Sequence, residues 1–169
     1  MNLLDALNAA NGGQNIEALA NQFGISGDQA QSVLGQLLPA LAQGAQQNSG
    51  LDGLLGALSG GNHSQYIDDP STLSQPETIE DGNGILGHLL GSKDASRALA
   101  SHVAGNTGLS DALIKQMLPV VASLAMGALS KQTRQSASPL DGIAGMLDFN
   151  KDGSAMDDVM GLMGKFFAR

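Results

Sequence analysis

Apolar side chains recur along this chain every three or four residues, which is the spacing of one face of an α-helix. Ile16, Leu19 and Phe23 form a short stripe of this kind, and a longer stripe runs over residues 30–41. Gly24 lies between the two stripes and marks a break, because glycine readily adopts the left-handed conformation that ends helices. Alternation of apolar and polar residues, the pattern of a half-buried strand, is missing. The pattern predicts an all-α, multihelical protein.

Two prolines fall inside apolar helical segments. Pro39 and Pro119 each lack the backbone N–H that a helix interior uses, so a kink or a boundary is expected at both. The longest apolar run, residues 117–129, contains Pro119 and Ser123 and is 13 residues long. A membrane span needs roughly 20 residues. The run therefore predicts a buried core helix and no membrane span.

The chain also resembles itself. The string Gln-Leu-Leu-Pro at 36–39 matches Gln-Met-Leu-Pro at 116–119, and Ala-Leu-Ala recurs at 18–20 and 98–100, both 80 residues apart. Residues 51–58 match residues 140–147 at a separation of 89. Because the order of the matches is kept, we infer two copies of one helical unit. Convergent use of Ala, Leu and Gly is the alternative explanation.

This duplication suggests how the chain is organised. Residues 1–61 form the first helical repeat and residues 85–169 the second, which ends in an acidic loop. Residues 62–84 between them are rich in Ser, Thr, Gln, Pro and acids, and they predict a linker or long surface loop. The two repeats could pack as one compact domain. Residues 130–139 predict a second loop.

Composition narrows the chemistry that this helical chain can perform. Only 3% of the 169 residues are aromatic and none is Trp, so Leu, Ala, Met, Ile and Val must build the core. The absence of cysteine excludes disulfides, thiol catalysis and Cys-type zinc sites. No nucleophile with a matching base stands out, which predicts a protein that is not an enzyme.

Charge is distributed unevenly. The net charge of −8 combines nine acids and no Lys or Arg in residues 1–92 with seven acids and eight bases in residues 93–169. The first part would repel a phosphate backbone. Its acidity serves solubility or attracts a cationic partner or a metal.

The strongest chemical signal lies near the carboxyl terminus. Calcium prefers hard oxygen ligands at alternate loop positions, with glycine at position 6 of the loop. The candidate ligands are Asp148, Asn150, Asp152, Ser154 and Asp158. Gly153 falls at position 6, but Val159 stands where an EF-hand places its closing Glu. A calcium site and an ordinary polar turn followed by a helix both fit these residues.

Two other motifs favour packing over binding. Residues 16–39 and 98–119 each suggest a helix-turn-helix, but the second helix of each has at most one basic residue, and nucleic-acid binding normally needs several. Gly82, Gly84 and Gly87 satisfy the dinucleotide string G-x-G-x-x-G, yet an acidic, proline-led segment precedes them in place of a buried strand. Small residues at this spacing favour close helix contacts, and we expect a short helix over 85–90.

The chain resembles the YidB-like family of bacterial proteins of unknown function. The resemblance rests on Asp-Gly-Asn-Gly-Ile-Leu-Gly-His at 81–88, on the string at 116–119, and on the acidic motif at 148–158. It implies an all-helical fold and carries over no activity, substrate or site.

The residues support a functional hypothesis of a small helical interaction or scaffold protein with one calcium-stabilised loop at 148–158. Its partner is an unknown protein or a second copy, and a cytoplasmic location is expected because the first residues lack the basic region of a secretory signal. The alternative is an enzyme that uses acids of 148–158 or the pair Asp68 and Asp69 in a pocket between the repeats. A helix-turn-helix nucleic-acid binder is a weaker alternative.

Overall fold

The computed structural model of the protein describes residues 3–48, 56, 58–59 and 63–135, and all regular elements within these residues are helical. The elements are α1 (Leu3–Ala9), η1 (Ala10–Gly13), α2 (Gln14–Phe23), α3 (Gly27–Asn48), α5 (Gln65–Asp68), η2 (Pro70–Ser74), α6 (Pro76–Leu90), α7 (Lys93–Thr107) and α8 (Asp111–Gln135). The prediction of an all-α, multihelical protein is confirmed.

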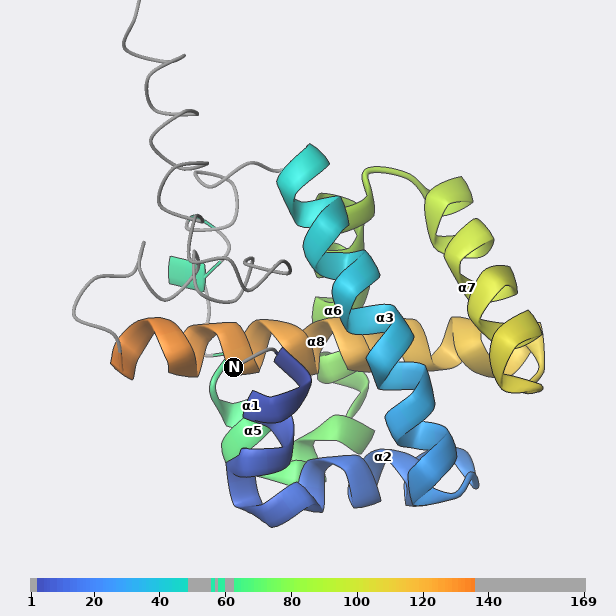
Figure 1. Cartoon of the computed structure of the whole chain (residues 1–169). Helices are drawn as coiled ribbons and strands as arrows, with labels where there is room; N and C mark the ends of the chain where they lie inside the picture. The colour runs from blue at the N-terminus through green and yellow to red at the C-terminus, as the bar shows by residue number, and fades with distance from the viewer. Residues whose placement is uncertain (1–2, 49–55, 57, 60–62, 136–169) are drawn as a thin grey trace, which may run out of the picture.

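The longest helix, α8, runs through the middle of the molecule (Figure 1). α3 crosses it on one side, α6 lies on the other side, and α7 stands at a steep angle beside the start of α8, into which it leads. Each residue from Met117 to Ala128 is buried, as the apolar run predicted. α8 is thus surrounded by the amphipathic helices.

α8 also passes a length and composition test for a membrane span. Its segment Asp111–Lys131 has a mean hydropathy of 1.6, and within the described residues it is the one helix that is long and apolar enough to cross a membrane. However, 72% of the most apolar window is buried inside the protein. A core helix meets the same test, because a helix that is apolar all round is found in protein cores as well as in membranes.

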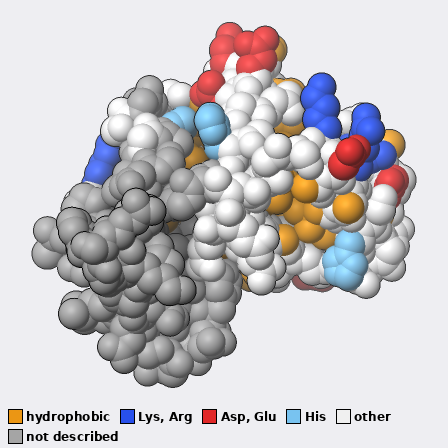
Figure 2. Space-filling view, turned by 90° about the horizontal axis from the view of Figure 1, so that it is seen from above, with side chains coloured by type: hydrophobic (Ala, Val, Ile, Leu, Met, Phe, Trp, Pro, Cys, Tyr) orange, Lys and Arg blue, Asp and Glu red, His pale blue; other side chains and the backbone are white. Residues whose placement is uncertain are grey.

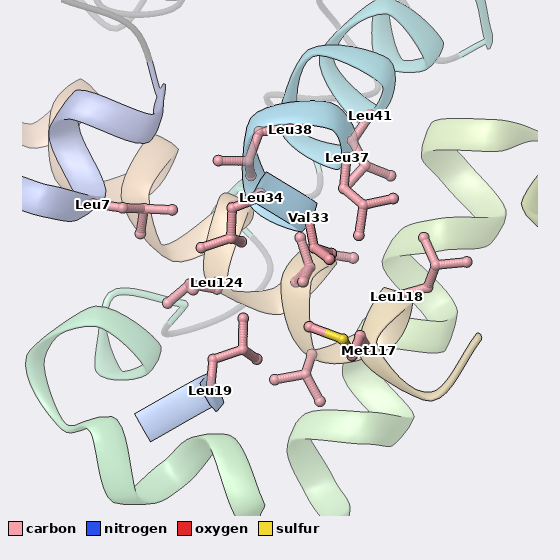
Figure 3. Close-up of a cluster of buried hydrophobic side chains, with 14 of the residues drawn as sticks. Leu7, Leu19, Val33, Leu34, Leu37, Leu38, Leu41, Met117, Leu118 and Leu124 are labelled. Atoms are coloured by element: carbon pink, nitrogen blue, oxygen red, sulfur yellow. The ribbon is translucent and has the colours of Figure 1, made fainter. Parts of the chain in front are cut away.

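Aliphatic side chains fill the core, as the shortage of aromatic residues predicted. In Figure 3, leucines of α1, α2 and α3 point toward Met117, Leu118 and Leu124 of α8. The three α8 side chains are at most 2% exposed. Burial of apolar surface in this layer, at about 25 cal/mol per Å², is the main force that holds the helices together.

The turns of the pairs α2–α3 and α7–α8 have the same construction. Gly24 and Gly108 adopt left-handed φ angles of 66° and 74°, and each donates its N–H to the carbonyl four residues earlier. Two residues later, Ser26 and Ser110 accept the N–H of the third following residue, at 3.2 and 3.3 Å. These are a left-handed helix end followed by a serine cap of the next helix.

Gly24 and Gly108 of the two turns are 84 residues apart, and the buried residues of α2 and α7 follow the same separation. The buried residues Ile16, Leu19 and Ala20 of α2 correspond to buried residues of α7 at 100, 103 and 104. The similar strings at 36–39 and 116–119 are 80 residues apart, so they lie about one helical turn out of register with the turns. This likeness of local structure does not establish an ancestral duplication, which stays a prediction.

Residues 62–84 differ from the linker that the sequence predicted. α5, η2 and the first half of α6 lie within this range, and α6 starts at Pro76, well before the expected helix at 85–90. Pro70 and Pro76 read as breaks in the sequence, but each begins a helix, where a missing N–H costs nothing. The loop expected at 130–139 also differs, because α8 continues to Gln135.

No helix boundary forms at Pro39 or Pro119, and the kink that the sequence also allowed stays a prediction. α3 and α8 both continue through their prolines without a boundary. Pro39 is exposed on α3, whereas Pro119 is buried under α6. Tertiary packing on both sides of a proline can hold a helix together despite the lost hydrogen bond.

Candidate functional site

The predicted calcium loop, with Asp148, Asn150, Asp152, Ser154 and Asp158, lies outside the described residues. Within the part of the chain that the structure describes, no group of three His, Asp or Glu side chains could hold a metal ion. The structure therefore leaves the calcium prediction untested.

The acidic pair Asp68 and Asp69 takes part in local structural contacts. Asp68 accepts a 2.9 Å bond from the ammonium of Lys131, which ties the end of α5 to α8. Asp69 accepts the backbone N–H of Ser71 at 3.0 Å and its hydroxyl at 2.6 Å, and these bonds lower the pKa of Asp69. A catalytic acid of the kind proposed for this pair needs a raised pKa, so the geometry gives the enzyme hypothesis no support at Asp68 and Asp69.

The helix-turn-helix of α2 and α3 offers no cationic surface. The exposed residues of α3 include Asp28, Gln29, Gln31, Ser32 and Gln43, and the helix carries no Lys or Arg. Positioning on a phosphate backbone normally depends on such side chains. The geometry of this pair therefore favours packing, as the sequence suggested.

The glycine-rich stretch at 82–87 lies inside α6, and its two sides face different surroundings. On the inner side, a β-carbon at Gly82 would come 1.9 Å from the carbonyl oxygen of Pro119. α6 and α8 therefore cross backbone to backbone at this point. Nearby, the hydroxyl of Ser123 donates to the carbonyl of Thr78 at 2.8 Å in the buried interface. Gly82 thus serves the close helix contact that the sequence predicted.

Asp81 links α6 to α5. The hydroxyl of Tyr66 donates a hydrogen bond to the carboxylate of Asp81. Burial, and then this hydrogen bond, raise the pKa of Tyr66 to about 12. Because the neutral phenol donates to the carboxylate, the bond favours the protonated form of Tyr66. Both residues thus fasten α5 to the body of the protein.

The outer side of α6 has a different character. Gly84 and Gly87 are exposed, and a β-carbon on either would meet nothing within 4 Å. Ile79, on the same helix, is 39% exposed and is the one large apolar side chain classed as exposed in the described region. Exposed Glu77 and Glu80 lie around it. We call this surface, made of Glu77, Ile79, Glu80, Asn83, Gly84 and Gly87, the outer face of α6.

Two charged side chains near this face have no partner among the residues that the structure describes. Of the Lys and Arg side chains that the structure describes, Lys93 is the one without a hydrogen bond or ion pair; it stands at the start of α7, just after α6. Glu80 likewise has no partner among the described residues. Figure 2 shows one group of acidic side chains at the top of the view and others beside the Lys and Arg side chains at the right.

Sequence reasoning missed the outer face of α6. The glycine spacing was recognised, but all three glycines were assigned to packing, and Glu77, Ile79 and Glu80 were assigned to a loop. The signal that could have located the face is Pro76 followed by Glu77. Proline and acidic residues are common in the first turn of a helix, so this pair marks an earlier start for α6.

A family model described as "Bacterial protein of unknown function (DUF937)" matches residues 5–132. The match covers nearly all the described helices and ends before the acidic motif at 148–158. No curated protein and no solved structure matches the chain.

Proposed function

Because the chain belongs to the YidB-like family of bacterial proteins of unknown function, its family supplies no activity, and we propose that it is a helical interaction module. Its contact surface is the outer face of α6. The observation that carries this proposal is the pair of outward glycines, Gly84 and Gly87, in the interior of an exposed helix.

Glycine in a helix interior costs roughly 0.5–1 kcal/mol relative to alanine. Gly82 offsets this cost by letting α6 touch the backbone at Pro119. Gly84 and Gly87 have no neighbour in the protein that needs their missing side chains. A second helix that approaches α6 from outside would need them, because small residues let two backbones come close together.

Other features of the face support a binding role. Exposed Ile79 supplies an apolar contact on one flank of the face, and exposed Glu77 and Glu80 make the face acidic. The acids Asp68 and Asp69, in contrast, are engaged in structural contacts, so binding is better supported than catalysis.

A photo-crosslinking amino acid at Asn83, in the centre of the face, tests the proposal in bacterial cells that express the full chain. We expect a protein adduct that disappears in the double variant G84Q/G87Q, whose side chains would block close approach. The variant should still fold, with a raised melting temperature, because glutamine is the better helix former.

Gly105 of α7 provides the matched control, since it is also exposed, and a β-carbon there would also meet nothing within 4 Å. G105Q should raise the melting temperature and leave the adduct unchanged. An adduct that persists in G84Q/G87Q, or no adduct in the wild-type protein, would contradict the interaction role of this face.

We also propose that Asp148, Asn150, Asp152, Ser154 and Asp158 bind one calcium ion that stabilises the protein. The spacing of their oxygens supports this proposal. Titration calorimetry of the full chain with calcium should give heat that is lost in D148N/D152N, and EDTA should lower the melting temperature of the wild type only. No heat at millimolar calcium would refute the site.

A further inference from the structure

We infer that the outer face of α6 binds the same face of a second copy of this chain, with the two α6 helices antiparallel about a twofold axis. The inference rests on the proposed function and names its partner. Three observations on α6 and the start of α7 carry it: the position of the outward glycines, the unpaired charges at the two ends, and the apolar residues along one flank.

The glycines set the point of contact. Gly84 and Gly87 are one turn apart and lie near the middle of the exposed part of α6. If two copies cross between these residues, each helix meets its partner where neither has a side chain. Antiparallel packing then places Glu80 of one copy opposite the C-terminal end of the other α6, at Gly91. Homodimers commonly have this self-complementary, twofold arrangement.

The charges at the two ends then become complementary. Lys93 follows Gly91 by two residues, so Glu80 of each copy comes within side-chain reach of Lys93 of the other. Both side chains are exposed, and neither has a partner within the described residues. The twofold axis forms this pair twice. Such rim pairs add modest affinity and favour this orientation, because a parallel arrangement would place Glu80 opposite Glu80.

The apolar residues are also placed for a twofold contact. Ile79 and Leu90 are eleven residues apart, about three helical turns, so they share one flank of α6. A twofold axis perpendicular to the two helices places this flank of one α6 beside the same flank of the other, and the two helices run in opposite directions. Ile79 of one copy therefore comes near Leu90 of the other, which is half-buried in the single chain. Each copy covers an exposed apolar side chain of its partner.

The contact involves mainly one helix from each copy, so it is smaller than a standard protein interface. Interfaces below about 1,200 Å² are usually weak, and a dissociation constant of about 10–100 µM is expected. Sedimentation equilibrium on the purified full chain, from about 5 to 500 µM, covers this range. The wild-type protein should change from monomer to dimer across it.

The double variant G84Q/G87Q should stay monomeric over the whole range, with a dissociation constant at least tenfold higher, whereas G105Q should dimerise like the wild type. E80K and K93E should each weaken dimerisation several-fold, because each places like charges opposite one another. An equimolar mixture of E80K and K93E should restore dimers, since one charge-swapped pair and one native pair then form.

A wild-type chain that is monomeric at all concentrations would overturn the inference. So would dimers that persist in G84Q/G87Q, or a mixture of E80K and K93E that fails to regain affinity. The proposed function fails separately: a monomeric chain that still gives a G84Q/G87Q-sensitive adduct in cells has an interaction face for a different protein.

Discussion

α3 and α8 begin at turns of the same construction, yet they are buried to very different extents. α3 keeps one exposed side, whereas α8 is enclosed from Met117 to Ala128. At the 84-residue separation set by the turns, exposed Gln43 of α3 corresponds to buried Gly127 of α8. Local sequence can specify where a helix begins, but neighbours that are distant in the chain determine which of its sides is covered.

The covering elements explain the difference. α5 lies directly on α8, where a β-carbon at Gly127 would be 2.6 Å from the carbonyl oxygen of His63. α6 crosses α8 at Pro119. Both elements come from residues 63–90. The four predictions that follow test how far the likeness of the two helix pairs extends.

The largest difference is expected between Val120→Asn in α8 and Gln36→Asn in α3, which lie at corresponding positions. Val120 is fully buried, so its variant leaves an amide without water and loses apolar packing, at a cost of about 3 kcal/mol or more. Gln36 is half-buried and accepts a 3.0 Å hydrogen bond from Asn106, so Gln36→Asn should cost only about 1 kcal/mol. Urea unfolding of both variants measures the contrast; equal costs would show that the two helices are not buried differently.

Gly127→Ala and Gln43→Ala form a second pair. The added methyl group at Gly127 would force α5 away from α8, and we expect a loss of about 2 kcal/mol. Gln43 is exposed, and its replacement should be within about 0.5 kcal/mol of neutral. Thermal unfolding followed by circular dichroism measures both values. A stabilising Gly127→Ala would contradict the close contact between α5 and α8.

Corresponding substitutions in the two turns should lower stability by similar amounts. Gly24→Ala and Gly108→Ala each place a β-carbon on a left-handed residue and should each cost about 1 kcal/mol. Ser26→Ala and Ser110→Ala each remove a helix cap and should cost about 0.5–1 kcal/mol. Chemical denaturation of the four variants provides the comparison. A large difference within either pair would show that the two turns are not equivalent.

The smallest effect should be a change in how stability depends on pH. It is confined to α5 and α6, the elements that cover α8. The pKa of Tyr66 is raised above its ordinary value of 10, so the folded protein holds this proton more tightly than the unfolded chain. Its contribution to stability is full below pH 10 and is lost as the pH rises through about 12. Asp81→Asn should lower the pKa, because it removes the negative charge beside the phenol.

Absorbance of phenolate measures this pKa directly, since Tyr66 is the one tyrosine of the chain and there is no Trp. An unchanged titration midpoint in Asp81→Asn would show that burial alone raises the pKa.

Much of the fold was predictable from the sequence. The apolar spacing predicted the helices, Gly24 predicted the end of α2, and the run at 117–129 predicted the core helix. The candidate site was only partly predictable. The spacing of Gly82, Gly84 and Gly87 indicated close helix contact, but it could not reveal that Gly82 faces Pro119 while the other two face outward.

The sequence by itself determined the elements whose causes lie within a few residues: helix spacing, left-handed glycine ends, serine caps and the aliphatic character of the core. The tertiary structure decided which helix was enclosed and how residues 63–84 became part of the body. It also decided which side of α6 was left uncovered. These outcomes depend on contacts such as that of Gly82 with Pro119, between residues far apart in the chain, whose pairing no local pattern records.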